Sequence, residues 1–255
     1  MKKIYSFLLN TLPRPLLIRL SYAFKWVAPY FYYGNNVTCN VCGKSFSKFL
    51  SYGTKVSLRD NVLCPHCLSL ERHRLMWLYL NTKTDFFTSP KKVLHIAPEQ
   101  CFYDKFKVQK NIEYTTADLF SPLADLKFDL HQIPLADNLY DVIFCNHVLE
   151  HVEDDHQCMQ ELLRILKPGG WAILQVPLDN SREITYEDKT IISPLEREKH
   201  YWQKDHLRLY GNDYAKKLSH AGFKVKEENF VKTLPKELIE KHRLAPEEII
   251  YVGMK

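Results

Sequence analysis

One segment of the chain, residues 135–177, constrains the fold more than any other. Residues 140–145 form a short run of apolar, aromatic and β-branched side chains, which is the composition of a strand buried on both faces. Residues 154–155, both aspartates, suit the start of a helix because a carboxylate accepts backbone N–H groups there. Residues 168–170, Pro-Gly-Gly, predict the helix end, and residues 171–176 predict a second buried strand. Because a strand–helix–strand unit of this length makes a parallel crossover, the sequence predicts an α/β fold.

Two motifs in this segment, YDVIFCNHVLEHV and LLRILKPGGWAILQVP, resemble the central part of class I S-adenosylmethionine-dependent methyltransferases, in particular those of type 11. The resemblance implies a Rossmann-like, seven-stranded, mostly parallel doubly wound sheet, with the last strand, residues 249–254, entering antiparallel. It also implies S-adenosyl-L-methionine as the cofactor and methyl transfer as the reaction. It does not identify the methyl acceptor.

The length and charge of the chain suggest three parts. A chain of 255 residues can hold one α/β domain and a smaller module, and no apolar run approaches the roughly 20 residues that span a bilayer. The net charge of +5 is uneven, because residues 1–59 carry nine Lys and Arg and no acid, which leaves −4 for the rest. This basic front suits an anionic partner or the acidic main domain of the same chain. We expect a basic helical arm (1–37), a cysteine module with a linking helix (38–82) and a methyltransferase domain (83–255).

The arm predicts an amphipathic helix with aromatic residues at its end. A basic, aromatic-rich helix of this kind either lies in a membrane interface or packs on its own domain, and the sequence leaves both open. The short apolar run after Met1 is interrupted by proline and followed by no cleavage site, unlike a secretory signal. We therefore expect a cytoplasmic protein, either free or peripheral at the membrane. The residues that share the apolar face are Leu16, Leu17, Leu20, Ala23, Phe24 and Val27.

Four cysteines in the pattern C-x2-C-x21-C-x2-C predict a structural zinc site. Cys39, Cys42, Cys64 and Cys67 form two pairs of the kind that bring four thiolates together around zinc, with an iron site or disulfides as alternatives. Four thiolates leave no open coordination position, so we expect a role in folding or recognition. The helix that follows carries basic residues at 72–74, which suit either a phosphate-bearing substrate or a solvated surface.

The first strand of the expected cofactor half, residues 92–96, leads into a turn without glycine. The resemblance places the methionine end of the cofactor here, with His95 and Ala97 at positions where the family has an acid and a glycine. Pro98 cannot donate a hydrogen bond, and Glu99 is expected to meet the cofactor's ammonium group.

Two further acids are expected to hold the nucleoside. Asp118 ends a second predicted strand, where nucleotide-binding α/β folds place a carboxylate that accepts ribose hydroxyls, although an Asp there can also cap the following turn. By the resemblance, Asp129 receives the adenine amino group and Leu130 packs on the ring or bonds it through its backbone.

The cluster HVLEH after the strand 140–145 has several readings. His147 and His151 match a zinc-peptidase pattern, but the methyltransferase motifs on both sides argue against that class. The cluster also resembles a divalent-cation site of ubiquinone-pathway O-methyltransferases. We predict His147 and His151 as candidate catalytic bases, with His147 favoured, from a pool that also contains His200 and His206. In the alternative reading Asn146 lines the cofactor while Glu150 and His151 hold the loop in place.

The acceptor is expected to lie against the polar, aperiodic insertion 178–210. A small-molecule or glycan/lipid-linked acceptor fits this aromatic-containing insertion and the interfacial arm. An RNA acceptor fits the basic front and the zinc module, but the main domain is acidic and carries no N-P-P-Y motif. A third reading is a catalytically inactive zinc-containing binding protein on the methyltransferase fold.

Overall fold

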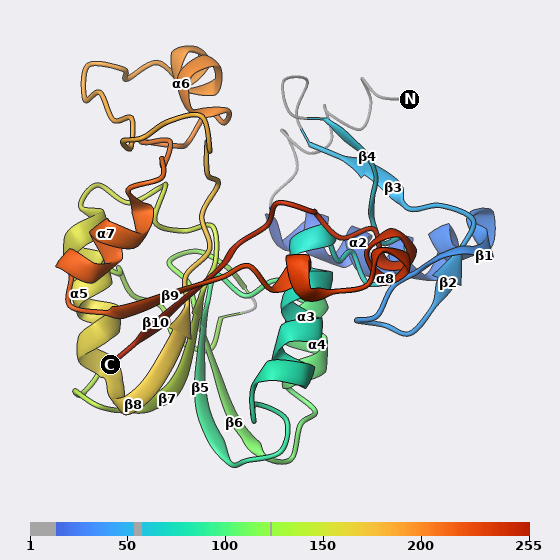
Figure 1. Cartoon of the computed structure of the whole chain (residues 1–255), viewed down its shortest axis with the longest axis horizontal. Coiled ribbons are helices and arrows are strands. Elements are labelled where there is room, and N and C mark those ends of the chain that lie inside the picture. The colour runs from blue at the N-terminus through green and yellow to red at the C-terminus, as the bar shows by residue number, and fades with distance from the viewer. Residues whose placement is uncertain (1–13, 54–57, 123) are drawn as a thin grey trace.

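The computed structural model describes residues 14–53, 58–122 and 124–255 (Figure 1). The helices are α2 (Arg14–Phe31), α3 (Glu71–Lys83), α4 (Gln100–Phe106), α5 (Asp155–Ile165), α6 (Pro194–Tyr201), α7 (Tyr214–His220) and α8 (Lys236–His242), with a 3₁₀ turn η1 (Phe230–Thr233). The strands are β1 (Tyr33–Thr38), β2 (Ser45–Phe46), β3 (Leu50–Tyr52), β4 (Arg59–Leu63), β5 (Lys91–Ile96), β6 (Ile112–Ala117), β7 (Tyr140–Cys145), β8 (Leu166–Ile173), β9 (Lys224–Glu228) and β10 (Ile250–Met254). Among the described helices, none has the length and apolar character that crossing a bilayer requires.

The central sheet has the strand order β6-β5-β7-β8-β10-β9. Strand β5 pairs in parallel with β6 and β7, and β7 pairs in parallel with β8. Strand β10 runs antiparallel to both β8 and β9, as expected for the last strand. The prediction of a Rossmann-like, mostly parallel α/β fold is therefore confirmed.

Helices cover both faces of this sheet because both faces of its central strands are apolar. Val93 and Val142 belong to a buried cluster with α3 and α4, whereas their neighbours Leu94 and Ile143 belong to a second cluster with α5 and α7. Figure 1 shows the two helical layers on opposite sides of the sheet. Alternation along fully buried strands thus produces a three-layer sandwich.

The expected seventh strand is wrong for the described residues, in which the sheet has six strands. Where a strand would pair with the free edge of β6, a single parallel bridge joins Ala117 to Leu126. The side chain of Asp125 accepts hydrogen bonds from the backbone N–H and the hydroxyl of Thr116, at 3.0 and 2.7 Å. Since the acid occupies a backbone donor that a strand ladder would use, pairing does not extend along this edge.

The helix and the strand around Pro-Gly-Gly differ in part from the prediction. Asp154 caps α5 by accepting the backbone N–H of Gln157 at 2.9 Å, as its position suggested. Strand β8 begins directly at Leu166, however, so that residues 168–170 lie within it at a shift of the β7–β8 register. Close packing explains the second glycine, because a Cβ on Gly170 would lie 2.9 Å from the carbonyl oxygen of Asp141.

The cysteine module is fixed to the main domain by Arg74 of α3. This fully buried side chain donates to the carbonyl oxygens of Ser69, His242 and Arg243 at 2.8, 2.6 and 3.0 Å, and its guanidinium lies over the ring of Phe49. One arginine therefore joins α3, the module and the end of α8. It does not belong to a solvated basic surface.

Candidate active site

The turn after β5 adopts the conformation that a glycine would favour, although alanine stands there. Ala97 has a φ of +49°, in the left-handed region. Its N–H donates to the carbonyl oxygen of Ala117 at 2.8 Å, so the end of the neighbouring strand β6 holds the turn in place. An alanine therefore occupies a backbone conformation that ordinarily favours glycine.

A largely enclosed acid, Glu99, follows this turn and lies among nitrogen donors, with 17% of its side chain exposed. His95 Nε2 lies 2.5 Å from Glu99 Oε2, while Asn146 Nδ2 lies 3.2 Å and His73 Nε2 3.6 Å from Glu99 Oε1. Burial by itself would raise the pKa of Glu99, but the imidazoles of His73 and His95 beside it outweigh this effect and hold the pKa well below its usual range. The site thus contains a carboxylate that stays ionised in a largely enclosed position.

His73 of α3 also lies beside Glu99, whereas the sequence grouped it with the basic residues at 72–74. Its Nδ1 accepts the backbone N–H of Leu70 at 3.0 Å, so the proton of the neutral ring lies on Nε2, toward Glu99. Burial, together with the nearby charge of Arg72, lowers the pKa of His73 to about 4. Helical spacing was the available signal, because His73 shares a face with Met76 and other buried residues of α3.

The two acids predicted for the nucleoside lie after β6 and in the following loop, and each uses one oxygen locally. Asp118 Oδ1 accepts the backbone N–H groups of Phe120 and Ser121 at 2.7 and 2.6 Å. Asp129 Oδ1 accepts both the backbone N–H and the Nδ1–H of His131, at 2.9 and 2.6 Å. The alternative that Asp118 caps a turn is therefore correct, and it is compatible with a second oxygen turned to a ligand. Leu130 is buried in the core cluster of the α5 side.

His147 stands at the end of β7 in a strained, left-handed conformation with φ +55°. Its backbone N–H donates to Gln175 O at 2.7 Å, and its Nδ1 lies 3.3 Å from Glu150 Oε1. The other ring nitrogen, Nε2, is buried without a hydrogen-bond partner among the described residues. A carboxylate at Nδ1 and an unpaired Nε2 form the arrangement of an oriented general base.

Glu150, His151 and His206 bring their ligand atoms together within 4.8 Å of one another. His206 Nδ1 lies 2.9 Å from the carbonyl oxygen of Tyr201, which can only accept, so the unprotonated Nε2 is free to bind. Both oxygens of Glu150 are buried and lack hydrogen-bond geometry to any described donor. This chemistry fits a divalent cation with an open coordination position.

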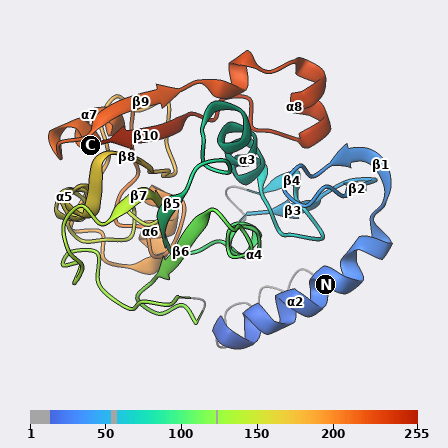
Figure 2. The same cartoon turned by 90° about the horizontal axis from the view of Figure 1, so that it is seen from below.

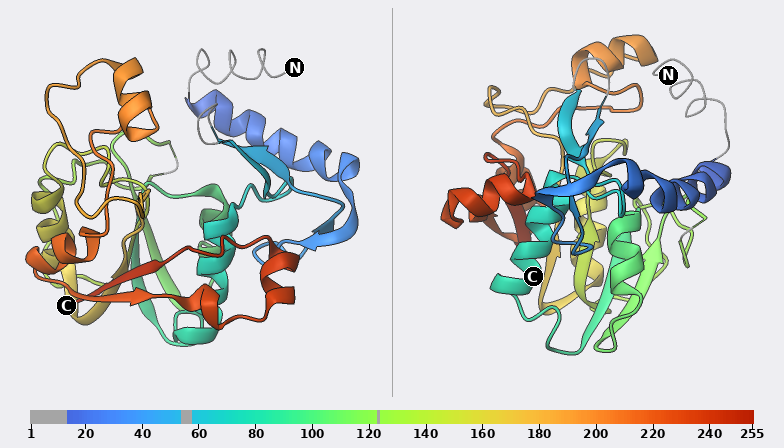
Figure 3. Two further views of the ribbon diagram at one scale, coloured as in Figure 1. Left: turned by 45° about the horizontal axis from the view of Figure 1, so that its top comes forward. Right: turned by 90° about the vertical axis from the view of Figure 1, so that its right-hand side faces the viewer.

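The insertion 178–210 is packed onto the HVLEH turn through Arg208. This buried guanidinium donates to the carbonyl oxygens of Leu149, Val152 and Glu153 at 2.7, 2.6 and 2.9 Å, and pairs with Glu187 at 2.9 Å. Figures 1 and 3 show the insertion with α6 standing beyond the ends of the parallel strands. The end of the insertion is therefore fixed to the HVLEH turn and the residues after it, whereas Ile184, Ile192 and Leu195 of the same insertion are exposed.

The four cysteines of the module converge as a zinc site requires. Cys39 Sγ lies 3.5 Å from Cys67 Sγ, Cys42 Sγ lies 3.8 Å from Cys64 Sγ, and all four sulfurs lie within 4.8 Å of one another. Zinc–sulfur bonds of about 2.3 Å in a tetrahedron place the sulfurs about 3.8 Å apart, so the thiols fit this metal. All four are free thiols, which excludes the disulfide alternative in this structure.

Part of the main domain is similar in sequence to known proteins. Residues 92–174 match the family model described as a methyltransferase domain. An uncharacterized 37.1 kDa protein in transposon TN4556 of Streptomyces fradiae is 38% identical over 60 residues, 24% of this chain and 17% of that protein. The ubiquinone biosynthesis O-methyltransferase of Rickettsia typhi is 38% identical over 71 residues, 26% of this chain and 28% of that protein. The match thus spans less than a third of either curated relative.

Solved structures show the same kind of similarity. A S-adenosylmethionine-dependent methyltransferase from Archaeoglobus fulgidus superposes with a TM-score of 0.48 at 17% identity, over 71% of this chain and 93% of that one. Residues 92–174, which contain the turn after β5, Asp118, Asp129 and the HVLEH cluster, therefore match a methyltransferase domain, the class that the sequence motifs of this part predict.

Proposed function

We propose that the chain transfers a methyl group from S-adenosyl-L-methionine to an oxygen or nitrogen of a small-molecule or glycan/lipid-linked acceptor. The observation that carries this proposal is the ionised, largely enclosed Glu99 at the turn after β5. A fixed anion at this place suits the cofactor's ammonium group, and it gains strength from its enclosed surroundings.

The remaining cofactor contacts follow from the acids of the same edge. Asp118 offers its second carboxylate oxygen to the ribose hydroxyls, Asp129 offers one to the adenine amino group, and Leu130 contributes apolar surface or its backbone. Asn146 contributes a buried Oδ1 that has no partner among the described residues. When bound, S-adenosyl-L-methionine supplies the sulfonium methyl group. The protein contributes mainly alignment of the acceptor with that methyl carbon.

His147 is the residue that we propose as general base. Glu150 Oε1 lies 3.3 Å from its Nδ1, and Nε2 is left to take a proton from an acceptor hydroxyl or amine. His151 lies next to it, 4.8 Å from the ring of His206, and is better placed to hold a cation with Glu150. The O-methyltransferase name of the Rickettsia typhi relative favours an oxygen acceptor.

Calorimetric titration with S-adenosyl-L-methionine tests the cofactor contacts. Affinity should fall at least about tenfold in Glu99→Gln and Asp118→Asn, since each loses a charge-assisted contact of about 1.5–3 kcal/mol. Glu113→Gln is the control, because this acid lies on β6 with a side chain that is 69% exposed. Absence of binding by the wild-type protein would contradict the proposal and favour a zinc-bearing binding protein without activity.

Methyl transfer from labelled cofactor to lysate fractions tests the acceptor class. The proposal predicts label in a fraction that resists ribonuclease, and a rate that falls in His147→Ala more than cofactor affinity does. Label that disappears after ribonuclease would contradict the small-molecule or lipid-linked acceptor and favour RNA.

The proposed metal of the module is zinc, held by Cys39, Cys42, Cys64 and Cys67 as a closed structural site. Metal analysis of the purified chain should return about one equivalent. A chelator should lower the urea midpoint of the wild type but not that of Cys64→Ser, and equal shifts in both would contradict a structural role.

A further inference from the structure

Helix α2 rests on the main domain through its polar side. Ser21 Oγ lies 3.0 Å from Gln100 Oε1, and Tyr22 donates its hydroxyl to Asp104 Oδ1 at 2.9 Å. Lys25 Nζ pairs with Asp104 Oδ2 at 2.8 Å, and its side chain is buried. Figure 2 shows the helix lying along the outside of the molecule, past α4 and the cysteine module. An amphipathic helix that covers a core turns its apolar side inward, whereas α2 turns its polar side toward the domain.

Its apolar side faces outward as a continuous stripe. Leu16, Leu20, Phe24, Val27 and Phe31 follow one another at steps of three and four residues, and all are exposed. Aromatic side chains broaden the end of this stripe: Trp26 is 79%, Tyr30 83% and Phe31 80% exposed. The prediction that the arm packs on its own domain with this face is thus wrong for the described part of the arm. The stripe requires another partner.

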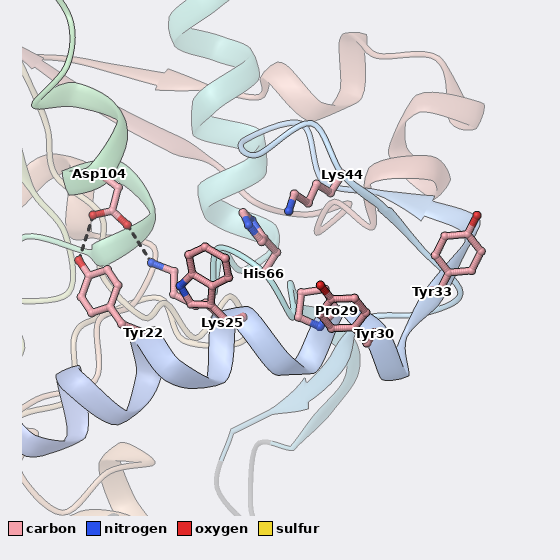
Figure 4. A pocket seen from close by; sticks show the side chains of 9 residues that line it. Tyr22, Lys25, Pro29, Tyr30, Tyr33, Lys44, His66 and Asp104 are labelled. Atoms are coloured by element: carbon pink, nitrogen blue, oxygen red, sulfur yellow. Dashed lines mark hydrogen bonds and ion pairs between the residues drawn. The ribbon is translucent and has the colours of Figure 1, made fainter.

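The surroundings of the stripe are basic. Residues 1–59 contain nine Lys and Arg and no acid, and Arg19 is exposed on α2 itself. A hollow of about 650 Å³ between α2 and the module is lined by Trp26, Tyr30 and Lys44, among others (Figure 4). Asp104 is the one acid among its lining residues, and Tyr22 and Lys25 occupy both of its oxygens. The hollow is in the size range of small-ligand pockets. It offers Lys44, which has no ion pair among the described residues, beside aromatic side chains.

We propose that this surface docks on a lipid bilayer that contains anionic phospholipid. The stripe lies in the boundary between headgroups and acyl chains, with the helix parallel to the membrane, while Arg19 and Lys44 reach the phosphates. Trp and Tyr at the end of the stripe are the side chains that prefer this boundary. A second copy of the chain is a poorer occupant, because pairing would bring together two basic surfaces whose lining acid, Asp104, is already paired with Lys25. The proposal does not rest on methyl transfer.

Co-sedimentation of the full chain with vesicles tests the stripe. We expect binding to phosphatidylcholine vesicles that contain phosphatidylglycerol, and at least about tenfold weaker partitioning for the triple variant W26S/Y30S/F31S, because three large apolar side chains leave the interface. The matched control is I184S/I192S/L195S, which removes three apolar side chains of the insertion that are 64–75% exposed. All of these side chains lie on the surface, so both variants should keep the urea midpoint of the wild type.

Charge reversal tests the phosphate contacts. R19E/K44E should weaken binding to the phosphatidylglycerol vesicles and leave any residual binding to phosphatidylcholine unchanged, whereas the control K232E/K236E, at exposed lysines near α8, should bind more tightly than R19E/K44E. No sedimentation of the wild type, or equal loss in both triple variants, would overturn the proposal. So would a dimer in size-exclusion chromatography that W26S/Y30S/F31S converts to monomer, since the stripe would then be a contact between copies.

Discussion

Replacing Arg208 by methionine should lower the free energy of unfolding by about 3–5 kcal/mol and loosen the insertion over the active site. Arg208 is 1% exposed and joins two segments that are far apart in sequence. Three of its contacts go to carbonyl oxygens of Leu149 in the HVLEH turn and of Val152 and Glu153 directly after it, at 2.6 to 2.9 Å. A fourth goes to Glu187 within the insertion. Methionine has a similar length and no donor, so it leaves all of these acceptors without their partner.

The magnitude follows from what stays buried after the change. A buried acceptor left without its donor costs about 1–3 kcal/mol, so three orphaned carbonyl oxygens account for a loss of this size. Glu187, whose side chain is 28% exposed, adds less because water solvates its charge. Burial lowers the pKa of Arg208, but the hydrogen bond to Glu187 and the charge of Asp155 outweigh this and raise it, so the guanidinium stays charged. Arg208→Lys keeps the charge but loses the planar fork, and should cost about half as much.

Urea unfolding measures the loss, and limited proteolysis of the insertion shows whether it is local. The control is Arg182→Met, in the same insertion, whose side chain is 43% exposed. It pairs with Asp179 at 3.1 Å and lies over the ring of Tyr186 at 4.8 Å. An exposed pair of this kind is worth less than about 1 kcal/mol. If Arg208→Met cost no more than Arg182→Met, or if the insertion resisted protease equally in both, the clamp would not hold the insertion on the HVLEH turn.

Three further outcomes follow from the site. Ala97→Gly should raise the free energy of unfolding by up to about 1 kcal/mol in urea, because glycine adopts the left-handed φ of +49° without strain, whereas Ala97→Val should lower it. Burial lowers the pKa of His73 from 6.5 to about 4, so the unfolded chain binds the proton at a higher pH than the folded chain does. The free energy of unfolding should therefore fall as the pH drops from 6.5 toward 4. His73→Gln should flatten this part of the curve of unfolding free energy against pH. Titration calorimetry with Mg²⁺, Mn²⁺ and Zn²⁺ should show a site that His206→Gln abolishes and that His156→Gln, at an exposed position on α5, leaves intact; equal binding by both variants would exclude the cluster as a ligand set.

Local signals predicted the parts of the fold that depend on local physics. Strand β7 has the bounds expected from its run of apolar residues, and Asp154 caps α5 as a carboxylate at a helix start does. At the glycine-less turn after β5, the local sequence suggested a backbone conformation different from that of a glycine turn. The structure keeps the turn because the neighbouring strand binds the N–H of Ala97, so a tertiary contact offsets a conformational cost of about 1–2 kcal/mol.

Other features depend on contacts between distant segments, which periodicity does not report. His73 lies near Glu99 although it belongs to α3, which precedes the domain. His206 lies near Glu150 although it belongs to the insertion 178–210. The apolar stripe of α2 was visible in the sequence, but the direction in which it faces is set by Asp104, about 80 residues later.

Helix α3 connects the cysteine module to the candidate active site. Arg74 fixes the helix to the loop after the last cysteine and to α8, while the preceding residue, His73, contacts Glu99 at the cofactor edge. Successive residues on a helix point about 100° apart, so one side chain faces the anchoring contacts and the other faces the site. A rotation of α3 that moved Arg74 away from Ser69 would also withdraw His73 from Glu99. We therefore expect disorder in the cysteine module to move His73 away from Glu99, while His95 keeps its contact with this carboxylate.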